Sequence, residues 1–281
     1  PKLIYSDTEY MHNTYFKFWL AKMSFNKIPF YTGQHGGYWG NNTQPIHFND
    51  VFTKFNSKWH TKIRKNNFQM PAPQLTRFVD MRLKNLESDN LLFIGHNTTQ
   101  FPRYLGTGPI SNEVFDQIKI IKSLTKNITI NKKFFFRPYK HTRYWKIEDE
   151  IYKEKIQVVE EDRYYRKIFK TSKVIITTHP RTAFLEALIS GPTIIILNKN
   201  YYIEDGKMLN MMKKLKDAKI MFSSGKDAAK HLNKVWFDIN SWWFNKKTVN
   251  ARKEFIKNIS PSDKGSLEKW INFFRKKKNE K

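Results

Sequence analysis

Short apolar runs alternate with helix-period segments along most of this 281-residue chain. Brief apolar runs between polar loops are typical of buried parallel strands, and amphipathic segments between them are typical of helices. The predicted strands are 2–5, 28–31, 51–59, 91–94, 133–137, 157–160, 174–176, 193–197 and 219–222. The predicted helices are 13–25, 113–124, 164–170, 183–190, 205–215, 226–235, 241–257 and 266–275. Strands that alternate with helices predict an α/β protein with doubly wound parallel sheets.

The order of these elements divides the chain into three parts. Residues 1–88 are expected to be the last part of one Rossmann-like domain, and residues 89–235 a second, complete one. Residues 236–281 are expected to be helices that pack back across the two domains. The chain begins at Pro1 and enters a strand-like run directly, so we expect a fragment in which the N-terminal domain is truncated.

The segment from Val174 to Ile196 is the most informative part of the chain. It reads as a strand, a polar loop with Pro180, a helix that starts near Thr182, and a second strand after Gly191-Pro192. Such a helix start offers backbone N–H groups and partial positive charge to a phosphate, and Thr182 is a candidate cap. Glu186 follows four residues later on the same face, where a ribose hydroxyl would reach it. Arg181, just before the helix, either joins a phosphate clamp or blocks it. A cap and an acidic residue in the second turn also occur for purely structural reasons.

A glycine-rich loop follows the predicted strand 28–31. In GQHGGYWG, residues 33–40, glycines such as Gly36 and Gly37 allow close approach of the backbone to a ligand. His35 lies among them, at the end of a strand where open α/β sheets place ligands, and its imidazole is suited to be a general base. A tight turn with a structural histidine is the equal alternative.

Two further polar loops follow predicted strands. FFFRPYKHTRYW carries Arg137 to the end of its strand, with His141 in the loop beyond, and an arginine there suits a diphosphate. Pairing of Arg137 with a nearby Asp or Glu is as good an interpretation. In IGHNTTQFPRYLG, Asn97 and Thr98 are candidate contacts to phosphate or acceptor, although such loops are often merely polar.

Composition narrows the functional classes. The net charge of +26 indicates an anionic partner, which could be nucleic acid, anionic lipid or a phosphorylated substrate, and lysine-rich composition alone explains it equally well. The dense run Arg275–Lys278 reads as a solvated tail. The absence of cysteine excludes disulfides and thiolate metal sites. No apolar run approaches the ~18 residues that cross a bilayer, and no Asp-x-Asp metal motif is present.

Taken in chain order, these motifs resemble a known group of enzymes. The chain is similar to transferases of bacterial surface-carbohydrate clusters (lipopolysaccharide, O-antigen and capsule), which have the two-domain glycosyltransferase B (GT-B) fold. The resemblance rests on the entry into GQHGGYWG, the strand that ends in Arg137-Pro138, the pair Thr182 and Glu186, and Trp242-Trp243 near the C-terminus. A more distant similarity links it to capsular Kdo transferases and to teichoic-acid glycerophosphotransferases.

The resemblance implies the assignment of roles. A His-Gly pair supplies the base in the distant relatives, so the resemblance implies that His35 is the catalytic base or an acceptor-site residue. It also implies that Arg137, Thr182 and Glu186 contact the donor nucleotide. We expect a nucleotide-sugar donor bound by residues 89–235, a glycan or lipid-linked acceptor, and no metal or other cofactor. The expected location is cytoplasmic, peripheral at the inner face of the cytoplasmic membrane, with no nucleic-acid partner. A basic nucleic-acid-binding module and a non-catalytic polysaccharide-assembly protein are the alternatives.

Overall fold

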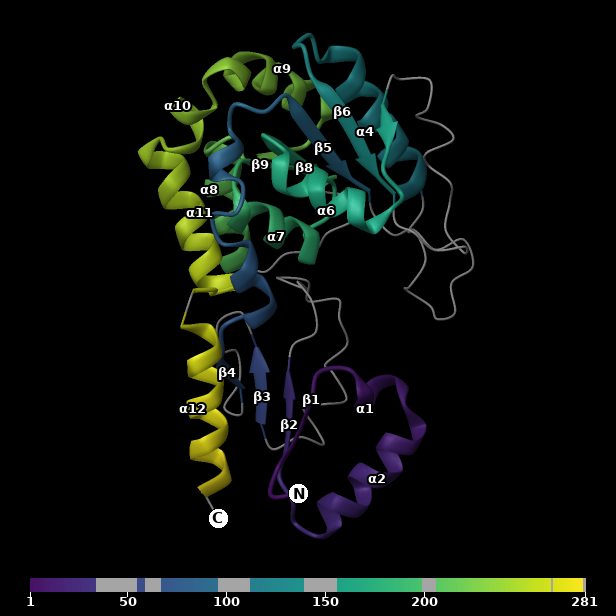
Figure 1. Cartoon of the computed structure of the whole chain (residues 1–281), viewed down its shortest axis with the longest axis vertical. Coiled ribbons are helices and arrows are strands. Elements are labelled where there is room, and N and C mark those ends of the chain that lie inside the picture. Colours follow the sequence, from purple (N-terminus) through teal and green to yellow (C-terminus); the bar gives the residue numbers. More distant parts are fainter. Residues whose placement is uncertain are drawn as a thin grey trace.

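The computed structural model describes residues 1–33, 55–58, 67–95, 112–138, 156–198, 206–263 and 265–279. Within them it contains two parallel β-sheets with helices packed around them (Figure 1). No helix in these ranges is long and apolar enough to span a bilayer.

A six-stranded parallel sheet forms the larger part of the molecule. Its order is β10-β9-β8-β5-β6-β7, so β5, the first of these six strands in chain order, lies inside the sheet. The strands are β5 (Asn90–Ile94), β6 (Lys133–Arg137), β7 (Gln157–Val158), β8 (Val174–Thr177), β9 (Thr193–Ile196) and β10 (Met221–Phe222). Apolar runs such as Val174–Thr177 are buried at every position, as expected for strands covered on both faces. The predicted parallel α/β architecture is therefore confirmed.

Helices cover both faces of this sheet. Alternate residues of β5 belong to different cores: Leu91 and Phe93 lie in the larger cluster, and Leu92 and Ile94 in the smaller one. The larger cluster contains buried side chains of α4 (Glu113–Asn127), α8 (Gly206–Asp217) and α9 (Gly225–Val235), and the smaller one those of α6 (Asp162–Thr171). Helix α7 (Thr182–Ser190) contributes to both clusters. The sheet is thus doubly wound.

A smaller four-stranded sheet has the order β1-β2-β3-β4, and all of its strands are parallel. The strands are β1 (Ile4–Ser6), β2 (Phe30–Gly33), β3 (Phe55–Lys58) and β4 (Asn67–Gln69). Helices α1 (Glu9–His12) and α2 (Thr14–Phe25) connect β1 to β2, which confirms the predicted strand-helix-strand order. Asn13 caps α2 by accepting a hydrogen bond from the backbone N–H of Phe16 at 3.0 Å.

The C-terminal helices run along both sheets (Figure 1). One helix was predicted over 241–257, but the structure has two, α10 (Ile239–Trp243) and α11 (Lys246–Ile259). Asn245 is the reason, because its side chain accepts from the backbone N–H of Lys247 and starts a new helix. Helix α12 (Ser266–Asn279) packs on the small sheet, where Trp270 lies 5.4 Å from the ring of Tyr5. The domain boundaries at residues 88 and 235 stay a prediction.

One buried arginine fixes the segment between β4 and β5, which connects the two sheets. After the short 3-10 helix η1 (Pro73–Phe78), Arg82 is fully buried just before a second one, η2 (Leu83–Asn85). Its guanidinium donates six hydrogen bonds of 2.8–3.4 Å; the acceptors are Ser172 O, Lys173 O, Ala187 O, Ser190 Oγ, Pro192 O and Thr193 Oγ1. Burial lowers the pKa of Arg82 to about 9, so the side chain is charged at neutral pH.

Replacement of Arg82 should therefore destabilise the protein strongly. Arg82→Met leaves several buried carbonyls without a donor, and we expect a loss of about 3–5 kcal/mol in the free energy of unfolding. Urea unfolding measures this loss. Lys84→Met, an exposed change two residues away, is the matched control and should cost less than about 0.5 kcal/mol. Equal stabilities of the two variants would contradict a structural role for Arg82.

His231 should make stability depend on pH. Its ring packs 4.8 Å from Trp242, and burial, followed by the charges of Lys219 and Lys234, lowers its pKa from 6.5 to about 4. Between these values protons bind the unfolded chain preferentially, so stability should fall as the pH drops from 6.5 to 4. The cost at the lower end should be about 2–3 kcal/mol. Denaturant unfolding of His231→Phe should lack this component, and an unchanged pH dependence would show that other groups cause it.

Candidate functional site

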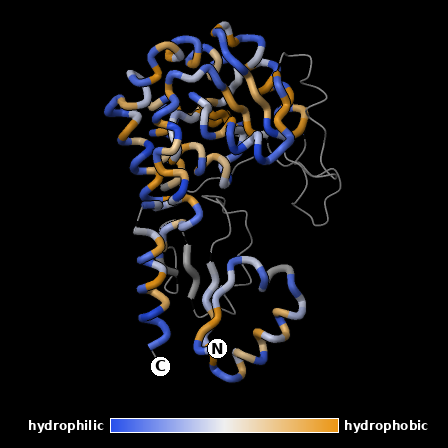
Figure 2. Tube along the Cα trace, viewed as in Figure 1, coloured by the Kyte–Doolittle hydropathy of each residue, from blue (hydrophilic) through white to orange (hydrophobic). Residues whose placement is uncertain are grey.

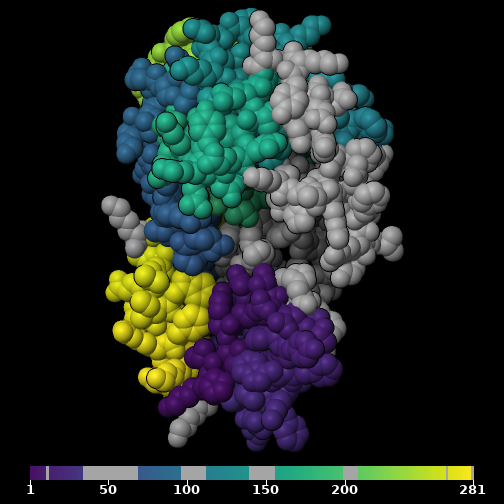
Figure 3. All heavy atoms as spheres, turned by 45° about the vertical axis from the view of Figure 1, so that its right-hand side comes forward, coloured from purple at the N-terminus to yellow at the C-terminus, as the bar shows by residue number. Residues whose placement is uncertain are grey.

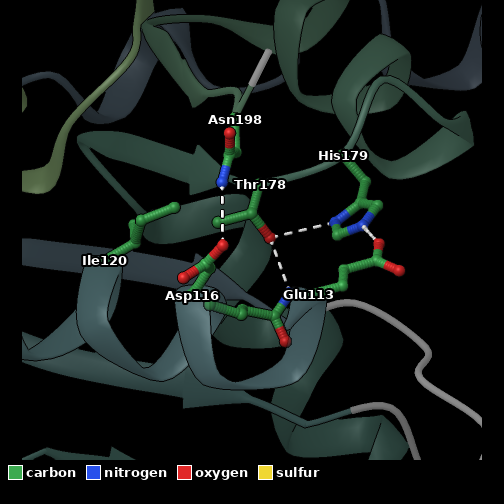
Figure 4. A pocket seen from close by; sticks show the side chains of 7 residues that line it. Glu113, Asp116, Ile120, Thr178, His179 and Asn198 are labelled. Carbon is green, nitrogen blue, oxygen red and sulfur yellow. Dashed lines mark hydrogen bonds and ion pairs between the residues drawn. The ribbon is translucent and has the colours of Figure 1, made fainter. Parts of the chain in front are cut away.

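A small pocket lies at the carboxyl edge of the six-stranded sheet (Figure 4). Thr178 and His179 directly follow β8, and Asn198 follows β9. The opposite wall is the first two turns of α4, with Glu113 and Asp116. Its cavity volume of ≈ 20 Å³ is room for about one water molecule. Open parallel sheets bind their ligands at this edge.

Hydrogen bonds join the two walls of the pocket. Nε2 of Gln117 donates to Thr178 Oγ1 at 2.9 Å, and Thr178 Oγ1 lies 3.1 Å from Nδ1 of His179. Nε2 of His179 lies 3.0 Å from a carboxylate oxygen of Glu113, as Figure 4 shows. A second link runs from Asn198 Nδ2 to Asp116 at 3.2 Å. These bonds fix the start of α4 against the loop after β8.

His179 is neutral in this network. Its side chain is 10% exposed, and burial, followed by the charge of Arg181, holds its pKa well below 6.5. A neutral ring satisfies the whole chain of bonds when Thr178 donates to Nδ1 and Nε2–H donates to Glu113. In the described residues the side-chain oxygen Oε1 of Gln117 is buried without a hydrogen-bond partner. The network thus leaves one acceptor available beside the pocket.

Glu186 lies one turn inside α7, on the side of the helix that meets the connection between the sheets. It is partly buried, and its carboxylate makes no hydrogen bond or ion pair with any described residue. Burial raises the pKa of Glu186 to about 7, and the charge of Arg77 in η1 opposes the rise. Tyr165 of α6 is near enough for Glu186 to raise its pKa further, after burial. A buried carboxylate without a partner is costly unless a ligand uses it.

The structure corrects the predicted helix cap. Thr182 is the first residue of α7 rather than its cap, because Arg181 has the extended dihedral angles of a cap residue, φ −120° and ψ −169°. Arginine has no side-chain acceptor, so the side chain of Arg181 does not cap this helix start. Thr182 and Glu186 still share one face of the helix, four residues apart.

Arg137 pairs with a carboxylate, which was one of the two interpretations of this residue in the sequence analysis. Its guanidinium donates to the carbonyls of Val159, at 3.0 Å, and Glu160, and forms an ion pair with Asp162. It also lies 4.7 Å from the ring centre of Tyr165. These contacts hold the start of α6 against the end of β6, and a direct contact between Arg137 and a donor stays a prediction.

The remaining predicted site residues, His35, Gly36, Gly37, Asn97, Thr98 and His141, lie outside the described residues. The pocket residues Glu113, Gln117, Thr178 and His179 were not predicted. One signal was present in the sequence, because Thr178, His179 and Asn198 directly follow apolar strands. Nothing local indicated that the first turns of α4 would face them.

Comparison with solved structures shows the fold. The wall teichoic acid polymerase TagF superposes with a TM-score of 0.52 at 11% identity, covering 91% of this chain and 69% of that chain. MurG of Acinetobacter baumannii gives a TM-score of 0.51 at 12% identity, with the same coverage. A protein described as a UDP-N-acetylglucosamine 2-epimerase from Listeria monocytogenes gives 0.54 at 11% identity, covering 97% of this chain and 73% of that chain. The fold is therefore GT-B, as the resemblance implied.

Comparison of the sequence with curated proteins gives no match. A family model, by contrast, matches residues 1–274, which is nearly the whole chain. Its description is LIC12162 family transferase. With this match, the parallel sheets and the GT-B likeness together, the chain belongs to the LIC12162 family and is a transferase.

Proposed function

We propose that this chain is a glycosyltransferase-like enzyme that moves a sugar from a nucleotide-activated donor to a cell-surface glycan or a lipid-linked acceptor. Glu186 is the observation that carries the proposal. It is a partly buried carboxylate without a hydrogen-bond or ion-pair partner among the described residues, one turn inside the helix that follows β8 at the carboxyl edge of a parallel sheet. A ribose presents two adjacent hydroxyl donors that would supply the missing bonds.

The donor phosphates would lie at the start of α7. The partial positive charge of the helix start and the side chain of Arg181 would face the charge that develops on the leaving group. Thr182 would add a hydroxyl donor there. The pocket beside Thr178, His179 and Gln117 has room for about one water molecule, and a water there would bridge the available Oε1 of Gln117 to the next part of the donor. Arg137 would support the site through Asp162 and Tyr165.

The acceptor side of the reaction belongs to the smaller sheet. His35, two residues after the end of β2, is the proposed base that takes the proton from the acceptor hydroxyl, with Gly36 and Gly37 beside it. Asn97, Thr98 and His141 follow β5 and β6 and are proposed as further donor contacts. Because arginine and a helix start would stabilise the leaving group, we propose a reaction that needs no metal ion.

The similar proteins support this class of substrate. TagF is a wall teichoic acid polymerase, which builds a polymer of the cell surface. The Listeria protein is described as acting on UDP-N-acetylglucosamine, a nucleotide sugar. We place the present chain in the cytoplasm, where nucleotide sugars are made, working on an acceptor held at the inner face of the membrane.

Glu186→Gln should weaken nucleotide binding without destabilising the protein. Loss of a charged hydrogen bond to ribose should weaken nucleotide binding by about 1.5–3 kcal/mol. Calorimetric titration with CMP, CDP, UDP and GDP measures this loss, and wild-type affinity should rise as the pH passes about 7 and Glu186 ionises. An unchanged dissociation constant would remove Glu186 from the donor site.

The same variant should be more stable than the wild type in alkaline solution. Because the folded-state pKa of Glu186 is raised from 4.5 to about 7, the contribution of Glu186 to stability is lost as the pH rises through this range. At pH about 8 Glu186→Gln should be more stable by about 2–3 kcal/mol, with little difference at pH about 4. Glu268→Gln, an exposed change in α12, is the control and should show neither effect.

His35→Ala should abolish transfer, because no base then takes the proton from the acceptor hydroxyl. Donor binding should stay intact, because His35 is not a proposed donor contact. Transfer of labelled sugar to an extracted lipid-linked acceptor, with and without a chelator, measures both the role of the base and the need for metal. Wild-type turnover in His35→Ala would exclude the histidine as base. Salt-sensitive binding to duplex DNA, without preference for any nucleotide, would instead identify a nucleic-acid-binding protein.

A further inference from the structure

Helix α2 exposes several large apolar side chains to solvent. None of its residues is buried, and four of its aromatic side chains are exposed: Tyr15 88%, Phe18 74%, Trp19 41% and Phe25 89%. Figure 1 shows α2 at the end of the molecule farthest from the six-stranded sheet, and Figure 2 shows apolar residues along its length. Clusters of exposed aromatic rings mark interaction sites.

The exposed rings form a row distinct from the side that packs on the protein. Phe16, Leu20 and Met23 are partly buried, and Phe16 lies 6.4 Å from the ring of Phe30 in β2. Tyr15, Phe18, Lys22 and Phe25 have the spacing i, i+3, i+7, i+10, which places them on a neighbouring face of the helix. The inner face therefore accounts for the packing of α2, and the outer row is exposed beside the part of the small sheet that the structure describes.

The charge around this row has one sign. Lys17 and Lys22 in α2 and Lys27 just after it are exposed, and residues 14–33 contain no Asp or Glu. The nearest acidic residues in the chain are Asp7 and Glu9, and Glu9 accepts a hydrogen bond from Asn13 at 3.0 Å.

The basic end of α12 lies at the same end of the molecule. Phe274 packs 5.3 Å from Tyr5 in β1, and the run Arg275–Lys278 follows it in the last turns of the helix. Arg275, Lys276 and Lys278 are exposed. Figures 1 and 3 both show α12 beside the N-terminal segment at this end of the molecule. Phe16 of α2 contacts Phe30, and Phe273 of α12 contacts Tyr31, the next residue of β2, so the two helices cover opposite faces of the small sheet. Both helices reach the same end of the molecule, which we call the aromatic-basic end (Figure 1).

We propose that the aromatic-basic end docks the protein on an anionic lipid bilayer. The rings of Tyr15, Phe18 and Phe25 would enter the boundary between head groups and acyl chains, as the apolar residues of interfacial helices do. The lysines would stay at the level of the anionic head groups, which their long side chains reach. Docked this way, the molecule holds its six-stranded sheet and the pocket beside α4 away from the bilayer, in water where a nucleotide donor diffuses (Figure 1).

Vesicle flotation tests the docking. The whole chain should partition onto vesicles of phosphatidylglycerol and phosphatidylcholine, and weakly onto phosphatidylcholine alone, with binding that declines at high salt. Phe18→Ser with Phe25→Ser should reduce partitioning at least about tenfold, because two rings no longer enter the bilayer. Lys276→Glu with Lys278→Glu should also reduce it and should weaken its dependence on anionic lipid.

Matched control variants distinguish binding through this surface from nonspecific binding to vesicles. Phe237 is 83% exposed in a distant part of the molecule, so Phe237→Ser should bind vesicles like the wild type. Lys226→Glu with Lys230→Glu, two exposed changes in α9, controls for net charge. Thermal unfolding and nucleotide titration of each variant confirm folding and keep this result independent of the donor site.

Two outcomes would overturn the proposal. One is vesicle binding by Phe18→Ser with Phe25→Ser equal to that of the wild type. The other is an absence of vesicle binding together with self-association that the same double variant abolishes, which would identify the aromatic row as a contact between copies of the chain.

Discussion

The buried guanidinium of Arg82 holds the connection between the sheets against the six-stranded sheet. It bonds carbonyl or hydroxyl groups at the end of α6, the end of α7 and the start of β9. Its charge has no acidic partner in this set, so peptide dipoles and hydroxyls solvate it in place of water. The same contact explains why residue 191 is glycine, because a Cβ at that position would lie only 3.0 Å from the Cβ of Arg82. The position of α7, and of Glu186 on it, depends on this anchor.

The candidate site combines groups that are satisfied with groups that are not. His179 and Arg137 are fully engaged in bonds that hold helices to strand ends. Glu186 and the Oε1 of Gln117 have no hydrogen-bond partners among the described residues. Such groups reduce stability, and proteins keep them where a ligand supplies the missing bonds. This contrast distinguishes binding residues from residues that position them.

The proposed membrane-docking surface and the proposed donor site lie at different ends of one molecule. Helix α12 links them, since Trp270 donates a hydrogen bond to Pro71 O at 2.8 Å and its neighbours pack on the small sheet. A long-lived orientation on the bilayer would bring the smaller sheet close to a lipid-linked acceptor while the nucleotide arrives from the other side. The lysines are spread widely over the sequence, and a net charge does not say where on the surface they lie. This arrangement therefore could not be predicted from the sequence.

Apolar periodicity alone determined the order of strands and helices, the parallel doubly wound sheet and the shared face of Thr182 and Glu186, since burial and helical repeat are local properties of the sequence. The tertiary structure decided which polar groups meet. The partners of Arg82 lie 90–111 residues away, and Glu113 lies 66 residues from His179. It also paired Arg137 with Asp162, one of the two arrangements that the sequence left open, and it left α2 with an exposed aromatic row where the sequence predicted an amphipathic helix. A polar side chain follows no period, so its partner is fixed only when distant segments pack together.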